Sequence, residues 1–496
     1  MKFFSVFSVS TFRMASHATI QEFDKLRSDV SGMMDKCVSQ YYRCPEVYVR
    51  FAQSGSFSEK GGYFRFGEEA TCYGDHGAHR GTELPTGKLY DASRDIAIKD
   101  GTIYLSFDLA QVVDNLRGER YVLEWRHDPA LSALAKMYYF IRPILSVGMR
   151  RHLQKFHLRG WNKLPFPRWP VDSSVDSLLQ QLLLLAIRAS QVEQIPFIWF
   201  WPDGAPSGAI MTHDVETIVG RDSCATLMDL DDSFGIKASF QVIPEERYSV
   251  GQEFLSSIRD RGFEVVVHDL NHDGHLYRTQ QQFRQRAAKI NAYGKKYGAI
   301  GFRAGVLYRK QVWYDALDFA YDMSVPNVAH LDPQRGGCCT VMPYFIGNIL
   351  ELPVTVTQDY TLFNILEEYS IDLWKRQIEL IMEKHGLMSF IVHPDYIVGT
   401  RERKIYEELL GHLAHLKKEK GIWIALPGEV NRWWRQRAEM RLVENGDGWR
   451  IEGDGAERAR IAYASEKEGQ LVITVQGGSI IEDSPCMPTS VTEQSP

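Results

Sequence analysis

The chain has 496 residues, a formal net charge of −6, and 44% hydrophobic and 24% charged residues. This composition is ordinary for a folded globular protein and excludes a mainly disordered chain. It also argues against a nucleic-acid-binding protein, because the charge balance is acidic and no long tract of Lys and Arg occurs. A chain of this length is expected to form roughly two to four domains.

The cysteines indicate a reducing environment. Seven cysteines are too few for a disulfide framework, and their number is odd. Cys338 and Cys339 are direct neighbours, which rarely allows a bridge, so we expect both to be buried thiols. We therefore predict a cytoplasmic location.

The first residues have some features of a secretion signal. The apolar run over residues 1–7 is short, however, and it is followed by serines and Arg13 rather than a clean cleavage site. We predict that residues 1–14 are a leader outside the folded protein, with secretion as the alternative. No apolar stretch of about 18 residues occurs, so no transmembrane segment is expected.

Residues 15–195 are expected to form an N-terminal mixed α/β region whose role the sequence does not reveal. Residues 102–107 alternate like a strand, and helical spacing follows from 109 to 157. Residues 130–149 are expected to form a packed amphipathic helix, with a helix on a membrane surface as the alternative. Residues 160–172 are rich in Pro and Trp, which is typical of an ordered linker.

The pattern changes near residue 196. From there to residue 430, short apolar runs alternate with segments of helical length, which predicts an α/β fold with a parallel sheet. Close to eight such repeats without a Gly-rich phosphate loop favour a closed or distorted (β/α) barrel over a Rossmann sheet. The expected strands lie within residues 209–212, 238–243, 263–267, 299–302, 321–325, 350–356, 388–392 and 422–426.

Residues 431–481 are expected to form a small β-rich appendage, since short apolar runs are separated there by Gly, Asp and Glu turns. Residues 482–496 contain Ser, Pro and Thr and are predicted to be a disordered tail. The segment Arg432–Arg437 contains two tryptophans. It could stack on sugar rings, but sealing the barrel against the C-terminal strands is the simpler interpretation.

Polar side chains follow four of the expected strands at the point where each strand ends. They lie within residues 212–216, 267–275, 301–305 and 391–396. Barrels place their active sites at the carboxyl ends of the strands, so we expect these groups to meet at one rim. Packing alone would not explain carboxylate, imidazole and guanidinium groups at four separate strand ends.

His268 and His272 are four residues apart, directly after an apolar run. If the chain curls helically there, both imidazoles face one way and could share a metal ion. Glu216 could supply an oxygen ligand. Two histidines and one carboxylate leave positions open for water and substrate, as catalytic sites do. His275 is expected to lie outside this set.

Three further residues have the chemistry that hydrolysis requires. Asp214 could take a proton from an attacking water, and His393 could give one to the leaving group. Arg303 could orient Asp214 through a charge-assisted hydrogen bond and keep it ionised. For His393, the alternative is a buried imidazole bonded to Asp395. Asp359 could line the pocket or cap the next helix, and the sequence does not separate these two.

Four motifs of the chain resemble, in order and spacing, those of the polysaccharide deacetylases, the NodB-homology or carbohydrate esterase family 4 group. They are Asp214-x-Glu216, His268-x3-His272, Gly301-Phe302-Arg303 and Ile391-Val392-His393-Pro394. The resemblance covers roughly residues 205–430. It implies a distorted (β/α) barrel, a divalent metal ion, usually zinc, and hydrolysis of an N- or O-acetyl group on a sugar.

The motif match also implies roles. Asp214 is the base, His393 the acid and Arg303 the residue that orients the base, while the metal ligands are Glu216, His268 and His272. The match further implies that the backbone N–H of Val306 donates to the oxyanion and that Asp322 tunes the acid. The chain departs from the family where Glu216 replaces the usual Asp and Gly305 the usual Pro, which bears on the substrate more than on the metal.

We therefore expect a metal-dependent hydrolase that removes an acetyl group from an N-acetylated sugar or polysaccharide. A hydrolase of another non-peptide C–N bond, in a cyclic amide or a formamide, is the first alternative, because the same chemistry serves those substrates. A catalytically silent carbohydrate-binding or scaffold protein is the second. The expected partners are a carbohydrate or small amide substrate and, through residues 15–200, enzymes of glycan biosynthesis.

Overall fold

The computed structural model describes residues 36–55, 61–77, 81–122, 158, 160–446, 448–477 and 480–482. The expected leader at 1–14 and the amphipathic segment at 130–149 lie outside these residues, as does the expected tail at 482–496 except for Glu482, which ends a strand. Within the described part of the chain, no helix is both long enough and apolar enough to cross a membrane.

The largest sheet has nine strands and forms the expected barrel. Its order is β12-β13-β11-β10-β9-β8-β7-β14, with β15 pairing to the start of β7, and every pair is parallel except β12–β13. Each of the expected strands overlaps an observed one, whereas β12 was not expected. The bounds are β7 Gly208–Val215, β8 Ala238–Val242, β9 Glu264–His268, β10 Gly301–Arg303, β11 Tyr321–Asp322, β12 Tyr344–Ile346, β13 Ile349–Glu351, β14 Leu387–Ile391 and β15 Trp423–Ile424.

The two ends of this sheet approach each other, which confirms the α/β fold with a curled parallel sheet. Val356, shortly after β13, donates its N–H to the carbonyl of Ser389 in β14 at 3.3 Å. The hydroxyl of Thr355 donates to the carbonyl of Leu387 at 2.6 Å. All eight residues of β7 are buried, as is typical of a parallel strand covered on both faces.

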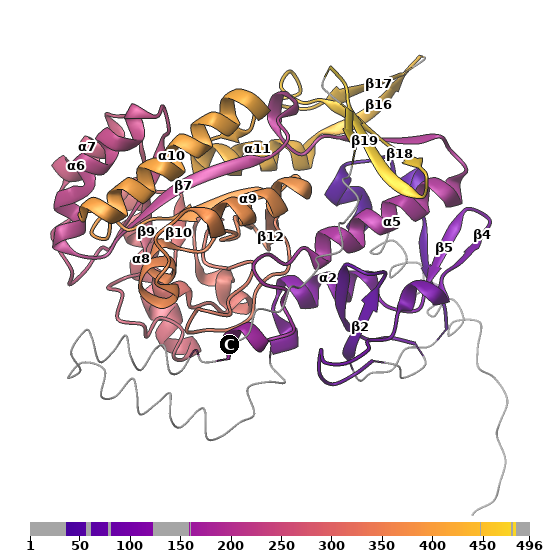
Figure 1. Cartoon of the computed structure of the whole chain (residues 1–496), viewed down its shortest axis with the longest axis horizontal. Helices are drawn as coiled ribbons and strands as arrows, with labels where there is room; N and C mark the ends of the chain where they lie inside the picture. The colour runs from indigo at the N-terminus through magenta and orange to yellow at the C-terminus, as the bar shows by residue number, and fades with distance from the viewer. Residues whose placement is uncertain are drawn as a thin grey trace, which may run out of the picture.

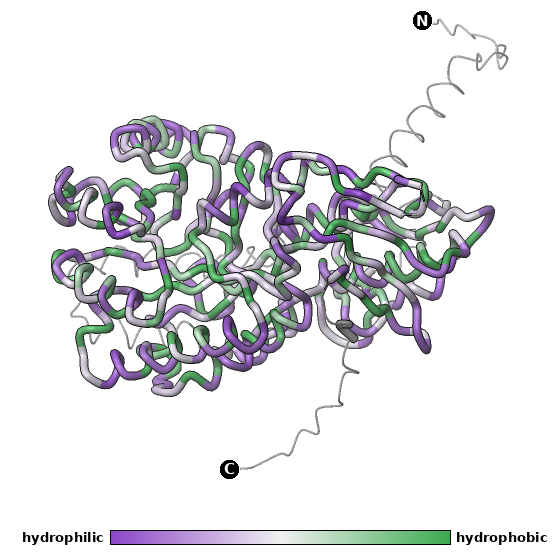
Figure 2. Tube along the Cα trace, turned by 90° about the horizontal axis from the view of Figure 1, so that it is seen from above, coloured by the Kyte–Doolittle hydropathy of each residue, from purple (hydrophilic) through white to green (hydrophobic). Residues whose placement is uncertain are grey.

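Helices surround the sheet on its outer side (Figure 1). In Figure 2, hydrophobic stretches run through the inside of the chain trace, and the outer turns are largely hydrophilic. The helices are α6 Ile218–Ser233, α7 Gln252–Arg259, α8 Gln280–Tyr297, α9 Asp372–Glu383, α10 Thr400–Lys420 and α11 Pro427–Glu439. Each crossover through a helix keeps neighbouring strands parallel.

Among its described residues, the N-terminal region contains a three-stranded sheet, a hairpin and the helices α2 and α5. Its sheet has the order β1-β5-β4, and β2 pairs with β3. The long helix of this region buries a leucine-rich face, as its sequence predicts. The bounds are β1 Phe51–Gln53, β2 Gly62–Phe66, β3 Ala70–Gly74, β4 Ala97–Lys99, β5 Thr102–Leu105, α2 Leu109–Arg117 and α5 Ser174–Ser190.

The C-terminal strands join a strand from the middle of the chain. β18 (Ile461–Lys467), β19 (Gln470–Val475) and β20 (Ile480–Glu482) form a four-stranded sheet with β6 (Gln194–Ile198), in which Ile198 faces Ile461. β16 (Arg441–Asn445) and β17 (Gly448–Glu452) form a separate hairpin. Figure 1 shows the C-terminal strands, in yellow, lying over α5.

The two tryptophans of the segment Arg432–Arg437 are buried. Trp433 is 3% exposed and its indole N–H donates to the carbonyl of Phe200 at 2.9 Å. Trp434 is 6% exposed, and its ring lies 5.5 Å from that of Trp201. Both rings are therefore buried and have no free face on which a sugar could stack.

Candidate active site

Four strands of the barrel bring polar side chains to one rim. Asp214 lies at the end of β7, His268 ends β9, Arg303 ends β10 and His393 follows β14. Glu216 lies between β7 and α6, where the side chain of Thr217 caps the helix by accepting the N–H of Gly220 at 3.0 Å. The cap begins the helix directly after Glu216, so this carboxylate stays at the rim.

Glu216, His268 and His272 form a cluster that could hold a metal ion. Each offers one ligand atom, and these atoms lie within 4.8 Å of one another. The Nε2 of His272 is 2.9 Å from Oε1 of Glu216, and the Nε2 of His268 is 3.9 Å from the same oxygen. All three side chains come from different points of the rim and converge on one volume.

The donor set fits a divalent cation. The Nδ1 of His268 lies 3.1 Å from the carbonyl oxygen of Arg303, which assigns the proton to Nδ1 and leaves the lone pair of Nε2 facing the cluster. The buried Nε2 of His268 has no hydrogen-bond partner among the described residues, and the buried Nε2 of His272 has only the Glu216 oxygen 2.9 Å away. Unpaired buried polar atoms are rare, and two imidazoles with one carboxylate are a common ligand set for zinc-like ions.

The chain reaches this arrangement through a left-handed turn rather than the helical curl expected from the His-x3-His spacing. Asp269 and His272 have φ values of 54° and 55°. Arg247 holds the turn by donating to the carbonyls of Asn271 at 3.2 Å and His272 at 2.7 Å. The two imidazoles share one direction because the backbone turns back on itself, so the expectation of a helix here was wrong.

Asp214 is paired with the buried guanidinium of Arg303. Nη1 of Arg303 donates to Oδ1 of Asp214 at 2.7 Å and to the hydroxyl of Thr212 at 2.8 Å. Nε of Arg303 donates to the carbonyl of Met323 at 3.0 Å. Burial alone would raise the pKa of Asp214, but the charge and hydrogen bond of Arg303, together with His268 and His393, outweigh burial and lower that pKa. Asp214 is therefore held as a carboxylate.

His393 is paired with Asp359, which the sequence left open between two roles. The Nδ1 of His393 is 2.6 Å from Oδ1 of Asp359, and the His393 N–H donates to Oδ2 at 2.7 Å. The Nε2 of His393 lies 3.6 Å from Oε1 of Glu216. Burial would lower the pKa of His393, but Asp359 and Glu216 outweigh it and raise that pKa well above its usual value.

The structure places Asp322 elsewhere than expected. The side chain against His393 is Asp359, whereas Asp322 accepts the hydroxyl of Ser324 at 2.7 Å and faces Glu351 on the neighbouring strand. Strand register explains the difference, because Asp322 on β11 points toward the buried partner strand. Asp395, the alternative partner, instead accepts the hydroxyl of Thr217 at 3.2 Å.

The turn after β10 lies directly beside the cluster. Val306 has a φ of 61°, a left-handed value that β-branched residues rarely adopt. A Cβ at Gly305 would lie 2.6 Å from Oδ2 of Asp269 and 2.8 Å from Cδ2 of His272. Glycine is therefore required there, and the backbone of this turn packs against the histidine ring.

Other polar residues singled out by the sequence have structural partners. The Nε2 of His213 is 2.9 Å from Oδ2 of Asp231, and both side chains are fully buried. The His275 side chain is 49% exposed beside Asp273. Cys338 and Cys339 are buried and unpaired, as expected.

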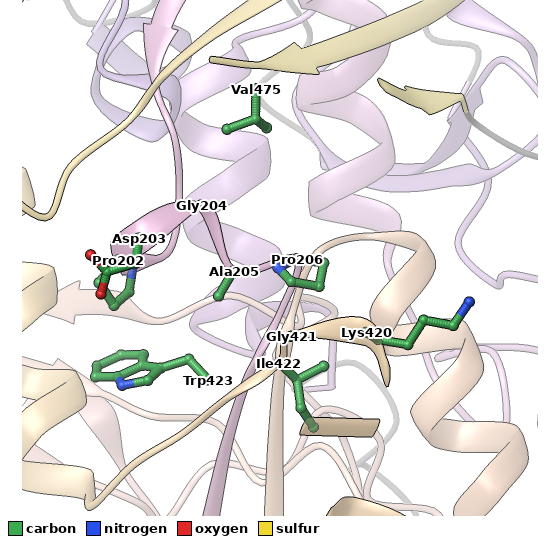
Figure 3. Close-up of a pocket in the computed structure, with 10 residues that line it drawn as sticks. All are labelled: Pro202, Asp203, Gly204, Ala205, Pro206, Lys420, Gly421, Ile422, Trp423 and Val475. Atoms are coloured by element: carbon green, nitrogen blue, oxygen red, sulfur yellow. The ribbon is translucent and has the colours of Figure 1, made fainter. Parts of the chain in front are cut away.

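A pocket of about 400 Å³ lies at the other end of β7 (Figure 3). Its lining includes Asp203 and Pro206, just before β7, and Lys420 and Trp423 near β15. The Asp214 end of the strand points the opposite way, so this pocket is separate from the cluster.

No known protein family and no curated protein matches the chain. Among solved structures, it is similar to a probable polysaccharide deacetylase from Pseudomonas aeruginosa PAO1, with 12% identity, a TM-score of 0.38, and coverage of 47% of this chain and 93% of the other. It is also similar to an allantoinase, Puue, with 13% identity, a TM-score of 0.37 and coverage of 47% and 92%. A third is a family 4 acetyl xylan esterase from Clostridium thermocellum in complex with a cobalt ion, with 16% identity, a TM-score of 0.30 and coverage of 46% and 91%. Polysaccharide deacetylases, which the sequence motifs resemble, are thus among the solved structures to which this chain is similar.

Proposed function

We propose that the protein is a metal-dependent hydrolase that removes an acetyl group from an N-acetylated sugar or polysaccharide. The observation that carries the proposal is the convergence of three kinds of group at one rim. These are the metal-ligand cluster of Glu216, His268 and His272, the paired base Asp214 and the paired imidazole His393. Each has a chemical task in hydrolysing an acyl bond, and packing requires none of them at this place.

When bound, a divalent cation, zinc by preference for this donor set, would polarise an acyl carbonyl and lower the pKa of a water. Asp214 takes the proton of the attacking water at Oδ2, because Arg303 holds Oδ1. Arg303 also keeps Asp214 ionised between turnovers.

His393 gives the proton that the leaving amine needs. Asp359 accepts the Nδ1–H of His393 and favours the charged, doubly protonated ring, in which Nε2 also carries a proton that faces the rim. The backbone N–H of Val306 donates to the oxygen that becomes negative in the transition state. Breaking the C–N bond then releases acetate and a free amine.

The acetylated sugar is proposed for the substrate because the chain shares its motifs with deacetylases, while the hydrolytic machinery itself suits any amide of similar size. The test is to load the full chain with zinc and to measure acetate and amine released from a panel of N-acetylated sugars, small cyclic amides and formamides. We expect acetate from at least one acetylated sugar, and a D214N variant that lowers kcat by on the order of 10²–10⁴.

The other possible results of this experiment distinguish the proposed function from the two alternatives. Turnover of a cyclic amide or a formamide with every acetylated sugar inert would overturn the sugar assignment and keep the hydrolase. Absence of turnover, together with no stoichiometric metal after supplementation, would support the scaffold protein. A His275→Ala variant is the matched control, because this exposed histidine lies on the same loop as His272 but outside the cluster.

A further inference from the structure

Glu119 and Arg309 form a buried ion pair that joins the N-terminal region to the segment after β10. Nε of Arg309 donates to Oε2 of Glu119 at 2.7 Å, and its Nη2 donates to Oε1, so the two groups meet in a two-pronged arrangement. The Arg309 side chain is fully buried and that of Glu119 is 9% exposed. Such a pair fixes orientation as well as charge.

The same guanidinium holds the strained turn beside the cluster. Nη1 of Arg309 donates to the carbonyl of Leu307 at 2.9 Å. Val306 and Leu307 have φ values of 61° and 51°, and non-glycine residues stay in this region only where neighbours hold them. The amide of Gln334 adds two bonds, accepting the N–H of Arg309 at 3.1 Å and donating to its carbonyl at 3.0 Å.

The surroundings of Glu119 are built to receive its carboxylate. Glu119 follows α2 and itself has a φ of 54°. Its Oε1 also accepts the N–H of Gly337 at 2.7 Å. A Cβ at Gly336 would collide with the same oxygen, so only glycine leaves room for the carboxylate. The contact therefore involves three separate parts of the chain that are shaped around one side chain.

We propose that Glu119 is a positioning residue, which acts through Arg309 to hold the Val306 turn where its backbone N–H can meet the acyl oxygen. This inference rests on the function proposed above. It gives the N-terminal region a part in the reaction, although none of its residues lies in the cluster. Losing the pair would act first on the turn, since the metal ligands lie on or directly after β7 and β9 and none of them contacts Glu119 or Arg309; His272, whose ring packs against Gly305, is the ligand nearest to the turn.

The test compares Glu119→Ala and Glu119→Gln with Asp176→Asn in the full chain. Asp176 is the matched control, because it is a buried acid of α5 that binds Thr340 at 2.6 Å and Val341 at 2.9 Å without touching the Val306 turn. We expect E119A to lower kcat by on the order of 10-fold or more with KM and bound zinc unchanged. E119Q keeps the shape of the carboxylate, so we expect part of the activity to return. D176N should lower stability without lowering kcat.

A second readout does not depend on turnover. Hydrogen exchange of the peptide spanning residues 304–310 should lose protection in E119A and keep it in D176N, while residues 264–272 stay protected in both. An E119A protein with unchanged exchange at 304–310 and unchanged kcat would overturn the proposal. If the wild-type protein hydrolyses no substrate but E119A still loosens this peptide, the proposed function fails and the positioning of the turn stands. If E119A does not fold, both kcat and the hydrogen exchange of residues 304–310 are measured on E119Q instead.

Discussion

Oδ1 of Asp359 lies 2.6 Å from Nδ1 of His393, although 34 residues separate them in the chain. Oδ2 of the same carboxylate accepts the backbone N–H of His393 at 2.7 Å. One carboxylate therefore fixes both the backbone and the ring, so the orientation and the tautomer of His393 are set together. This dependence leads to the first prediction.

Asp359→Asn should lower kcat by on the order of 10²–10³ while leaving KM nearly unchanged. The amide can present its NH2 to Nδ1, which would fix the neutral ring with its proton on Nε2, and the variant loses the charge of Asp359 that raises the pKa of His393. A neutral imidazole is a far weaker acid than an imidazolium, so the leaving group would receive its proton more slowly. Steady-state kinetics on the best substrate of the panel measure the effect. A variant with full kcat would show that His393 does not depend on Asp359.

Glu216→Gln should weaken zinc binding, because it replaces a charged ligand by a neutral amide. We expect about one equivalent of zinc in the wild-type protein and a loss of affinity in the variant that exceeds the 10–100-fold typical of outer-shell changes. Metal analysis after dialysis, and the rise of the melting temperature on adding zinc, both report it. His275→Ala should bind zinc as the wild type does, and equal binding by E216Q would remove Glu216 from the ligand set.

Gly305→Ala should displace the His272 ring, since its Cβ would lie 2.8 Å from Cδ2 of that ring. We expect a loss of about 1–3 kcal/mol in the free energy of unfolding and weaker zinc binding. Gly251→Ala is the control, because the space around a Cβ there is open and the backbone φ is −87°. We expect Gly251→Ala to lower the free energy of unfolding by less than about 1 kcal/mol, as is usual for a change at a helix N-cap. Equal effects of the two substitutions would contradict the close packing at Gly305.

The stability of the protein should fall as the pH drops below about 6.5, in part through His385. This imidazole is 7% exposed, and burial lowers its pKa to about 4. The folded state therefore prefers the neutral ring, and the unfolded state binds the proton first, near its usual pKa of about 6.5. Stability is complete above that pH and is lost as the pH falls toward 4, by about 3 kcal/mol for this group.

His385→Asn removes this titration and suits the left-handed backbone, whose φ is 55°. Urea unfolding at pH 7, 5.5 and 4 should show a shallower loss of stability in the variant. His330 is also buried with a pKa lowered to about 4, so part of the slope should remain. An identical slope in both proteins would mean that His385 does not titrate in this range.

The sequence predicted the barrel and the meeting of its polar strand ends because those signals are local. Asp214, His268 and Arg303 each end an apolar run, and parallel strands bring such ends to one edge. Asp359 was left undecided because its contact with His393 spans 34 residues and depends on the loop after Val356. Asp322 lies inside an expected strand, and only the strand register shows that it faces Glu351.

Two other structural features could not be predicted from the sequence, because they also depend on how distant parts of the chain pack. The left-handed backbone at Asp269 and His272 has no signature in residue type, since neither is a glycine. The pair Glu119 and Arg309 joins residues that are 190 positions apart, and neither lies in a recognisable motif. Contacts between residues far apart in the sequence depend on the packing of the whole chain. The hydrophobic periodicity of the sequence predicts local helices and strands and does not predict such contacts.

The pairing of β6 with β18 affects how the protein can be made. During synthesis β6 emerges some 260 residues before its partner, and until then its apolar edge has no strand to bond. An unpaired edge of this kind readily joins other chains. Shortened versions that stop after the barrel would keep that edge open permanently, so preparations intended for crystallisation or assay should retain residues 461–475 even if only the barrel is of interest.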